Sequence, residues 1–450
     1  MNYLVDAMTA EPWVVLNTDG RPSERLAREW SWDAGGTVLR LKLRKDVVFH
    51  DGTPLTAQIA ADAMREMLEL PDSPTTSSFK TVRSVDVDGD DTVILRLSEP
   101  NSFLLQDLSY VSVTLKKGKQ LLATGPFVPA AVDDQHAELR AFPRYYRGRP
   151  ALDEIDLKVY PTQRNAWAAL MRSDVDMLYA VSREALDFVE AETTVKTYSF
   201  LRPYYNVLVF NVRHPALKHA DVRRALNEAV DKQALVADAL RGRGRPADGP
   251  LVQEYWAYSP PAHPFVFNPE AAAARLEGAG FKIRPVPGGR MPSRFSFNCL
   301  MFADDPRFER TAILVQKQLA NVGVDMTLVP LPQKDLVLRL RQGDFDAFLF
   351  EMAGRSLNWA YGFWHSSDNG LFDSGYQSTD AVLDRIRLAR SEEEIRSGVA
   401  DFFQILHDDP PAVFLTFGET TRAVSRNFDV AGETGRDIVP AARNWRVSRQ

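Results

Sequence analysis

LAREWSWDAGGTVLRLKLRKDVVFHDGTPLTA, residues 26–57, is the stretch that best indicates how this chain folds. Trp30 and Trp32 fall on one face of a segment with alternating residue character, and a glycine pair follows as a turn. Residues 38–43 alternate again, with a leucine at every second position. The pattern predicts two strands joined as a β-hairpin.

Signals for a turn and a helix follow the hairpin. Asp51-Gly52 predicts a tight turn, and Thr56 is placed to cap a helix over residues 57–70, where apolar residues recur at helical spacing. We expect His50 to pack or to form a hydrogen bond within that turn. None of these side chains suggests bond-making chemistry, so the stretch predicts a scaffold.

Length and composition favour a globular protein of more than one domain. The 450 residues exceed one ordinary core, so two or three domains are expected. Hydrophobic residues make up 45% of the chain, and the net charge of −6 does not favour a nucleic acid or an anionic membrane as partner. No run approaches the roughly 18 apolar residues of a membrane span. The single cysteine, Cys299, can form no internal disulfide, and its apolar neighbours predict a buried, unreactive thiol.

No sequence pattern predicts an enzyme or a metal site. The seven histidines are scattered, and Pro215 separates the nearest pair, His214 and His219, which has no acidic residue at a fixed offset. No serine-nucleophile elbow, phosphate-binding loop or dinucleotide-binding fingerprint is present. We therefore expect no catalytic residues, no metal and no cofactor.

Further along the chain, predicted strands and helices alternate. Residues 155–159 and 175–178 are predicted strands on either side of a helix at 162–173, which indicates an α/β lobe. The strongest predicted strand is PYYNVLVFNV, residues 203–212, and it precedes a helix for which Asp221 is the expected N-cap. A second lobe of the same type is expected after it.

The opening hairpin resembles the signature of the extracellular solute-binding proteins that serve peptide and nickel ABC importers. Five later segments resemble the same family in the same order: 211–231 with DVRRALNEAVD, 267–281 with FNPEA and GAGF, 316–324 with QKQL and VGV, 345–347 with FDA, and 375–378 with GYQS. Thr379-Asp380 replaces the asparagine and proline that usually follow the last motif. Each motif is weak alone, but by their common order the chain is identified as a member of the family from about Glu11 onward.

The resemblance implies an α/β, periplasmic-binding-protein-like fold. It has two α/β lobes with a hinge around a ligand cleft, and a third small domain inserted near the N-terminus. The domains expected by analogy are lobe I (residues 1–17, 126–212 and 416–450), the inserted domain (18–125) and lobe II (213–415). The crossings near 211–213 and 412–417 are the expected hinges.

The loop after the FD strand is where the resemblance implies ligand selection. Peptide-binding members carry an aspartate there that receives the α-ammonium group of the ligand. Alignment on Phe345-Asp346 puts Arg355 near that position, with Glu351 close by. A guanidinium favours a carboxylate, a phosphate or a polar neutral group, so a peptide anchored by its N-terminus is disfavoured. The alternative is that Arg355 is a solvated loop arginine.

Aromatic residues are dense in the same loop and at the start of the 203–212 strand. Aromatic faces stack on peptide bonds, sugars or rings. Relatives often place cleft-lining aromatics at the strand start, and alternation directs one of two neighbouring tyrosines inward. The expected ligand-binding residues are Tyr204, Tyr205, Arg355, Asn358, Trp359 and Trp364.

The expected function is that of the substrate-binding component of an ABC importer. It would capture a peptide-like or other small organic solute between two lobes, as a monomer, and deliver it to a membrane permease. A carbohydrate or opine-like solute is the alternative ligand. A cytoplasmic ligand-sensing domain of a regulator would need a winged helix, and none is visible before Glu11. A hydrolase would need a triad or a metal site.

The resemblance also implies a periplasmic or extracellular location. The first ten residues, MNYLVDAMTA, have neither a basic region nor a long apolar region of a secretory signal. We therefore expect that the sequence is truncated at its N-terminus, the alternative being a cytoplasmic form.

Overall fold

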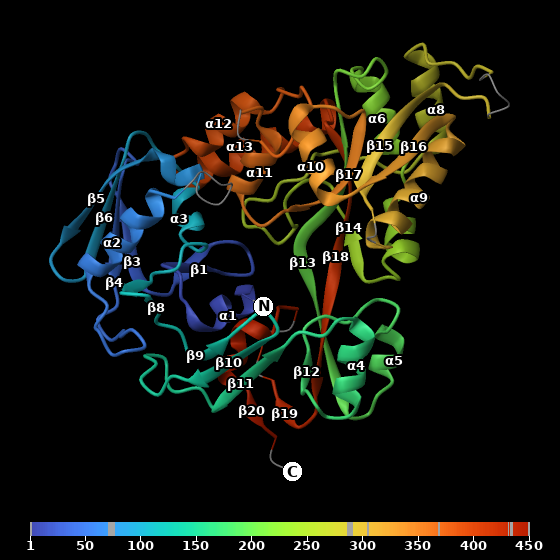
Figure 1. Ribbon diagram of the computed structural model, residues 1–450. Coiled ribbons are helices and arrows are strands. Elements are labelled where there is room, and N and C mark those ends of the chain that lie inside the picture. Colours follow the sequence, from blue (N-terminus) through green and yellow to red (C-terminus); the bar gives the residue numbers. More distant parts are fainter. Residues whose placement is uncertain are drawn as a thin grey trace. The chain divides into compact units, whose positions relative to one another are not determined.

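The structure is a computed structural model that describes residues 2–70, 77–285, 291–303, 306–367, 370–430, 432 and 435–448. The chain forms two compact units (Figure 1). The first unit comprises Met1–Leu201 and Glu419–Gln450, and the second comprises Arg202–Gly418. The crossings expected near 211–213 and 412–417 lie inside the second unit. The three-domain division stays a prediction.

The predicted hairpin is confirmed in the first unit. β3 (Ala27–Trp32) and β4 (Val38–Leu43) pair antiparallel, and β6 (Thr92–Leu97) and β5 (Val82–Asp88) complete a four-stranded sheet. The three leucines of β4 are at most 1% exposed. They belong to a core that also takes residues of α2 (Ala57–Leu68), the predicted helix.

The start of α2 is capped as the sequence predicts. The Thr56 hydroxyl accepts a hydrogen bond from the backbone N–H of Ile59 at 3.3 Å. His50 differs in detail from the expectation, because its hydrogen bond leaves the turn. Its Nε2 lies 3.1 Å from the carbonyl oxygen of Gly125, and its ring meets the edge of Phe142.

A buried carboxylate ties the first residues of the chain to this unit. Glu11 is 4% exposed, accepts a hydrogen bond from the Tyr145 hydroxyl at 2.7 Å and one from the Thr124 hydroxyl at 3.1 Å, and pairs with Arg25 at 3.4 Å. Burial raises the pKa of Glu11, while Arg25 and the hydroxyl donors oppose that change. The network joins segments more than a hundred residues apart.

Two further cores complete the first unit. One gathers α1, the β9–β10 pair and residues near the C-terminus, and the other lies between α4 and β12. The remaining elements are α1 (Asn2–Thr9), β1 (Val14–Leu16), β2 (Pro22–Glu24), η1 (Ser77–Thr81), α3 (Leu104–Asp107), β7 (Leu115–Lys117), β8 (Gln120–Leu122), β9 (Phe127–Val132), β10 (His136–Ala141), β11 (Glu154–Lys158), α4 (Gln163–Met171), β12 (Met177–Leu178), α5 (Leu186–Glu190), β19 (Phe428–Asp429), η3 (Val439–Asn444) and β20 (Arg446–Val447).

The second unit is built on a mixed sheet. Strand order in the sheet is β12-β18-β13-β17-β15-β16, and β14 pairs with β18. β15 (Phe295–Phe302) is parallel to both β16 (Val324–Leu331) and β17 (Ala347–Ala353), whereas β13 (Val195–Phe210) is antiparallel to β17. Both β13 and β18 (Ala412–Ser425) extend into the first unit.

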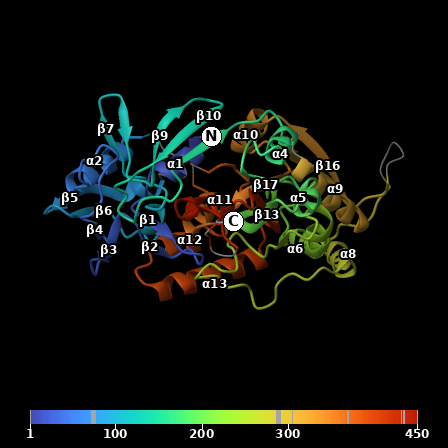
Figure 2. The same cartoon turned by 90° about the horizontal axis from the view of Figure 1, so that it is seen from below.

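Helices cover this sheet and bury its apolar side chains. Residues of β13, β15, β16 and β17 share one core with residues of α6, α8 and α9. Figures 1 and 2 both show α9 alongside β16. The bounds are α6 (Ala220–Glu228), α7 (Lys232–Ala234), η2 (Leu235–Ala239), β14 (Gly244–Pro246), α8 (Pro269–Gly278), α9 (Pro306–Asn321), α10 (Gln333–Gln342), α11 (Leu357–Trp364), α12 (Asp380–Arg387) and α13 (Glu392–Asp408).

The predicted N-cap at Asp221 is wrong. α6 begins at Ala220 after His219, so Asp221 lies in the first turn, where its carboxylate is 3.3 Å from Arg224 and 3.6 Å from Arg275. Pairing with two guanidinium groups replaces the expected cap.

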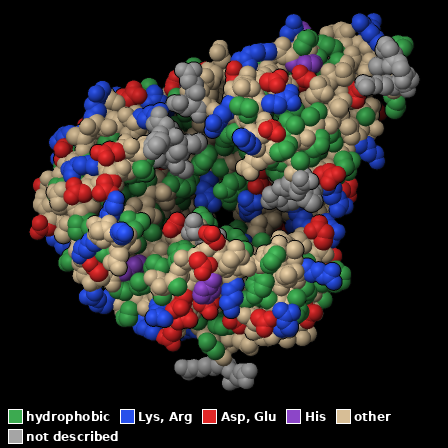
Figure 3. Space-filling model, in the orientation of Figure 1, with side chains coloured by type: hydrophobic (Ala, Val, Ile, Leu, Met, Phe, Trp, Pro, Cys, Tyr) green, Lys and Arg blue, Asp and Glu red, His purple; other side chains and the backbone are tan. Residues whose placement is uncertain are grey.

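The burial of Cys299 and the distribution of charged side chains are those expected from the sequence. Cys299 is fully buried, as predicted, and burial raises the pKa of its thiol to about 12. Acidic and basic side chains are interspersed on the visible face of each unit (Figure 3). In the described part of the chain, every helix is too short or too polar to cross a membrane.

Candidate functional site

Strand pairing brings the two predicted segments of the site together. β13 and β17 pair antiparallel, with Tyr204 opposite Ala353 and Asn206 opposite Glu351. Arg355 follows the end of β17 by two residues. Its guanidinium therefore comes over the Tyr204 ring, with 6.0 Å between the guanidinium carbon and the ring centroid.

A second guanidinium approaches the same ring. Arg202, two residues before Tyr204 along β13, has its guanidinium carbon 4.6 Å from the centroid of the tyrosine ring. Its Nη1 lies 3.2 Å from Oε1 of Glu351, and its Nη2 lies 3.2 Å from Oε2. The two side chains are 29% and 23% exposed, so this bidentate pair is mostly removed from water.

Arg355 differs from Arg202 in having no acidic partner among the described residues. Its side chain is partly buried. Within the described residues, the Arg355 guanidinium forms no ion pair and no hydrogen bond. Its contact there is with the Tyr204 ring. Partial removal of an unpaired cation from water costs free energy. The guanidinium also offers N–H donors in a planar, forked arrangement.

The other predicted aromatic pair is buried on the opposite side of β13. Tyr205 is fully buried and Trp364 is 3% exposed. The indole Nε1–H of Trp364 donates to the Tyr205 hydroxyl at 3.0 Å, and Phe414 and Phe417 pack against the Tyr205 ring. Burial raises the pKa of Tyr205 well above its usual range. Of the two neighbouring tyrosines, Tyr204 is thus the partly exposed one.

Asn358 and Trp359 lie in the first turn of α11. Ser356 caps this helix by accepting a hydrogen bond from the Trp359 N–H at 3.4 Å. Asn358 is 7% exposed, whereas the partly buried Trp359 stacks on Phe363 with ring centroids 5.6 Å apart. The structure therefore brings Tyr204 to Arg355 and Tyr205 to Trp364. The ligand roles of all six predicted residues stay predictions.

A close backbone approach positions the loop that carries Arg355. A Cβ on Gly354 would lie 2.6 Å from the carbonyl oxygen of Pro250 and 3.1 Å from the Tyr205 ring. The backbone N–H of Gly354 also donates to the carbonyl oxygen of Pro203 at 2.8 Å. Only glycine fits at this position without a shift of its neighbours.

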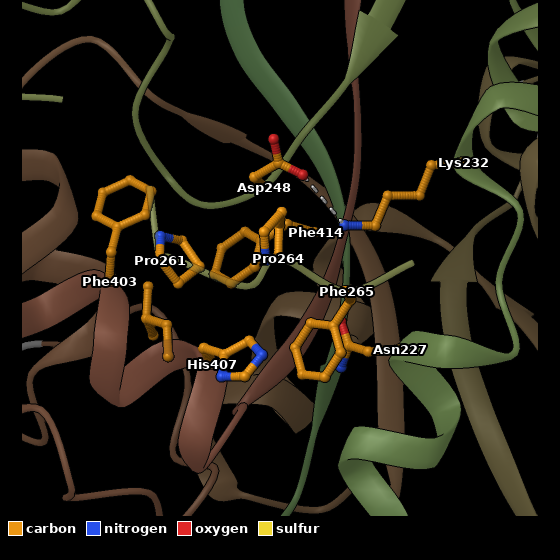
Figure 4. A pocket seen from close by; sticks show the side chains of 10 residues that line it. Asn227, Lys232, Asp248, Pro261, Pro264, Phe265, Phe403, His407 and Phe414 are labelled. Carbon is orange, nitrogen blue, oxygen red and sulfur yellow. Dashed lines mark ion pairs between the residues drawn. The ribbon is translucent and has the colours of Figure 1, made fainter. Parts of the chain in front are cut away.

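Two of the hollows that the described residues form lie within the second unit. One, of about 290 Å³, is lined by Arg341, Phe363 and Trp364 and by residues 365–367, 370 and 372–376. The other has room for only about 10 Å³, which is the space of one water molecule (Figure 4). Lys232 and Asp248 face each other there at 3.9 Å. This second hollow is too small for an organic solute.

The described residues offer no metal centre. Among them, no group of three or more histidine, cysteine or carboxylate side chains is placed to hold a metal ion. His219 instead packs against Phe281, and the His214 Nδ1 lies 3.3 Å from the Ala216 backbone N–H.

Sequence reasoning missed the pair formed by Arg202 and Glu351. Strand alternation puts residues 202, 204 and 206 on one face of β13, so Arg202 was identifiable as a neighbour of Tyr204. Nothing in the sequence fixes the register that sets Glu351 opposite Asn206.

Comparison with known proteins identifies the family. The family model described as bacterial extracellular solute-binding proteins, family 5 Middle, matches residues 21–371. The oligopeptide-binding protein AppA of Bacillus subtilis is 25% identical over 433 residues, which cover 88% of this chain and 78% of that protein. The heme-binding protein A of Haemophilus influenzae is 27% identical over 75% of this chain and 67% of that protein.

Solved structures share the fold. NikA of Brucella suis, in complex with Fe(III)-EDTA, matches with a TM-score of 0.86 at 22% identity, over 99% of this chain and 95% of that one. The expected α/β fold of the two-lobed periplasmic-binding type is confirmed by this match. Because the family model covers most of its length, the chain belongs to the bacterial extracellular solute-binding proteins of family 5, the substrate-binding components of ABC importers.

Proposed function

We propose that the solute captured by this protein is a small organic acid or a peptide-like molecule, and that one of its carboxylates binds Arg355. The observation that carries the proposal is the partly buried guanidinium of Arg355, which lies over the Tyr204 ring without an anion among the described residues. A ligand carboxylate would supply that anion.

The chemistry of the guanidinium favours this ligand group. Two parallel N–H donors match the two oxygens of a carboxylate, and a charge-assisted bond is about twice as strong as a neutral one. A ligand ammonium group would instead meet a like charge. A peptide held by its N-terminus is therefore disfavoured, whereas one held by its C-terminus suits the site.

The aromatic residues support a ligand with a flat or apolar portion. Tyr204 and Trp359 are both partly buried, so each keeps some ring surface open. A ring, a peptide bond or a sugar face would stack on either. An opine-like acid satisfies both the aromatic rings and Arg355, whereas a neutral carbohydrate would use only the rings.

The remaining parts of the proposal follow the family. The chain acts by binding alone, without catalysis, and it works as a monomer outside the cytoplasmic membrane with an ABC permease as its partner. Relatives of similar identity are named for an oligopeptide and for heme. Identity at this level therefore leaves the ligand to be decided by the residues of the site.

Native mass spectrometry of the purified protein tests the proposal. The wild type should carry an acid that fragments with loss of carbon dioxide, and Arg355→Gln should lose it. Arg396→Gln is the matched control, because Arg396 also stacks on a ring, that of Trp256 at 5.1 Å, but is exposed elsewhere in the unit. A neutral or purely cationic ligand, or an acid retained by Arg355→Gln, would refute the proposal.

A further inference from the structure

We infer that Glu351 sets the ligand charge that the site accepts. By neutralising Arg202, it leaves Arg355 as the uncompensated cation beside Tyr204, as far as the described residues go. The site then selects a solute with one carboxylate at this point over a solute with two. The inference rests on the proposed function, in which Arg355 receives a ligand carboxylate.

Three charged side chains surround the Tyr204 ring. The guanidinium carbons of Arg202 and Arg355 lie 4.6 Å and 6.0 Å from the Tyr204 centroid. The Glu351 carboxylate contacts Arg202 through both of its oxygens at 3.2 Å. Two positive charges and one negative charge therefore share the surroundings of a single aromatic side chain.

These charges act strongly on a ligand because they are partly removed from water. Arg202 and Glu351 are roughly three-quarters buried, so water screens them less than an exposed pair. Both guanidinium carbons lie within about one Debye length of the Tyr204 ring at physiological salt, and Glu351 contacts the nearer guanidinium. A ligand stacked on that ring experiences their summed charge, which is one positive unit.

This arrangement of charges makes the site selective for a monocarboxylate. A single ligand carboxylate balances Arg355. A second carboxylate in reach of the same ring would find Arg202 already occupied and would meet the negative charge of Glu351. Placing like charges against the wrong ligand is a common source of specificity. Removing the charge of Glu351 would free Arg202 and admit the second carboxylate.

Titration calorimetry with two acids and one matched amide tests whether Glu351 sets this selectivity. The probes are N-benzoylglycine with one carboxylate, N-benzoyl-L-aspartate with two, and N-benzoylglycinamide with none. Protein is first refolded from denaturant to remove any co-purified solute. The wild type should bind N-benzoylglycine more tightly than N-benzoyl-L-aspartate, and the amide weakest. In Glu351→Gln, the ratio of the two dissociation constants should shift toward the dicarboxylate by at least about tenfold.

Glu254→Gln is the matched control. Glu254 also binds an arginine through both oxygens, and this Arg245 lies over the ring of Phe417 at 5.9 Å. Removing that charge should leave the ratio of the dissociation constants unchanged. Thermal unfolding of both variants shows whether each folds.

The outcomes separate the two proposals. Failure of the wild type to bind either acid, or full binding by Arg355→Gln, overturns the proposed function and this inference with it. Binding that requires Arg355 but keeps the wild-type ratio in Glu351→Gln overturns the inference alone. A shift of the same size in Glu254→Gln also overturns it, because the effect would then be unspecific.

Discussion

Because of Lys232, the free energy of unfolding should rise with pH in the alkaline range. Its side chain is 12% exposed, its ammonium donates to the Ala247 carbonyl oxygen at 2.8 Å, and the Asp248 carboxylate is 3.9 Å away (Figure 4). Burial lowers the pKa of Lys232 from 10.5 to about 8, and Asp248 opposes the change only in part.

The sign of the effect follows from proton binding. Between pH 8 and 10.5, the unfolded chain keeps the Lys232 proton while the folded chain loses it. The free energy of unfolding therefore rises with pH across this window. Each pKa unit corresponds to about 1.4 kcal/mol, so the difference between the two states gives at most about 3.5 kcal/mol.

Urea unfolding of the wild type and of Lys232→Met at pH 7.5, 8.5, 9.5 and 10 measures this contribution. Other titrating groups act on both proteins alike, so the difference between their unfolding free energies isolates Lys232. That difference should move by roughly 2.5 kcal/mol in favour of the wild type between pH 7.5 and 10. Lys45→Met is the control, since Lys45 is 72% exposed, and its difference should stay flat. A flat or falling difference for Lys232→Met would refute the reasoning.

Two further substitutions test contacts that hold the second unit. Arg223 is 3% exposed, donates to the carbonyl oxygens of Pro410 and Leu217, and pairs with Asp409. Because Arg223→Met leaves these buried groups without a partner, it should lower the free energy of unfolding by about 3–5 kcal/mol. Arg224→Met next to it should cost under about 1 kcal/mol, and equal losses in urea unfolding would contradict the account. Tyr205→Phe removes the acceptor of the buried Trp364 indole N–H and should cost about 1–3 kcal/mol; unchanged stability would show that the indole finds another acceptor.

The parts of the fold that depend on local pattern are predictable from the sequence. Alternating leucines predict β4, and Thr56 with the apolar spacing after it predicts α2, because both signals lie within a few residues of the element they specify. The prediction of Asp221 as an N-cap is wrong because the interaction that determines its position is not local. Its carboxylate pairs with Arg275, more than fifty residues away, and local pattern carries no information about that partner.

The site is predictable in part. Family motifs and strand alternation led to Arg355 and to the choice between Tyr204 and Tyr205, but alternation alone does not say which tyrosine is buried. That depends on Trp364, which supplies an indole N–H to the Tyr205 hydroxyl. Strand register brings Glu351 to Arg202 across about 150 positions, so that its carboxylate balances the guanidinium, and no short motif encodes that register.

A crystal structure of the protein with its co-purified solute would show most directly whether Arg355 binds a carboxylate of the solute. We expect a ligand carboxylate whose oxygens lie about 2.7–2.9 Å from two guanidinium nitrogens of Arg355, with Glu351 still bound to Arg202. A ligand that turns an ammonium, a hydroxyl or an apolar group toward Arg355, or an Arg355 side chain without ligand contact, would contradict the account.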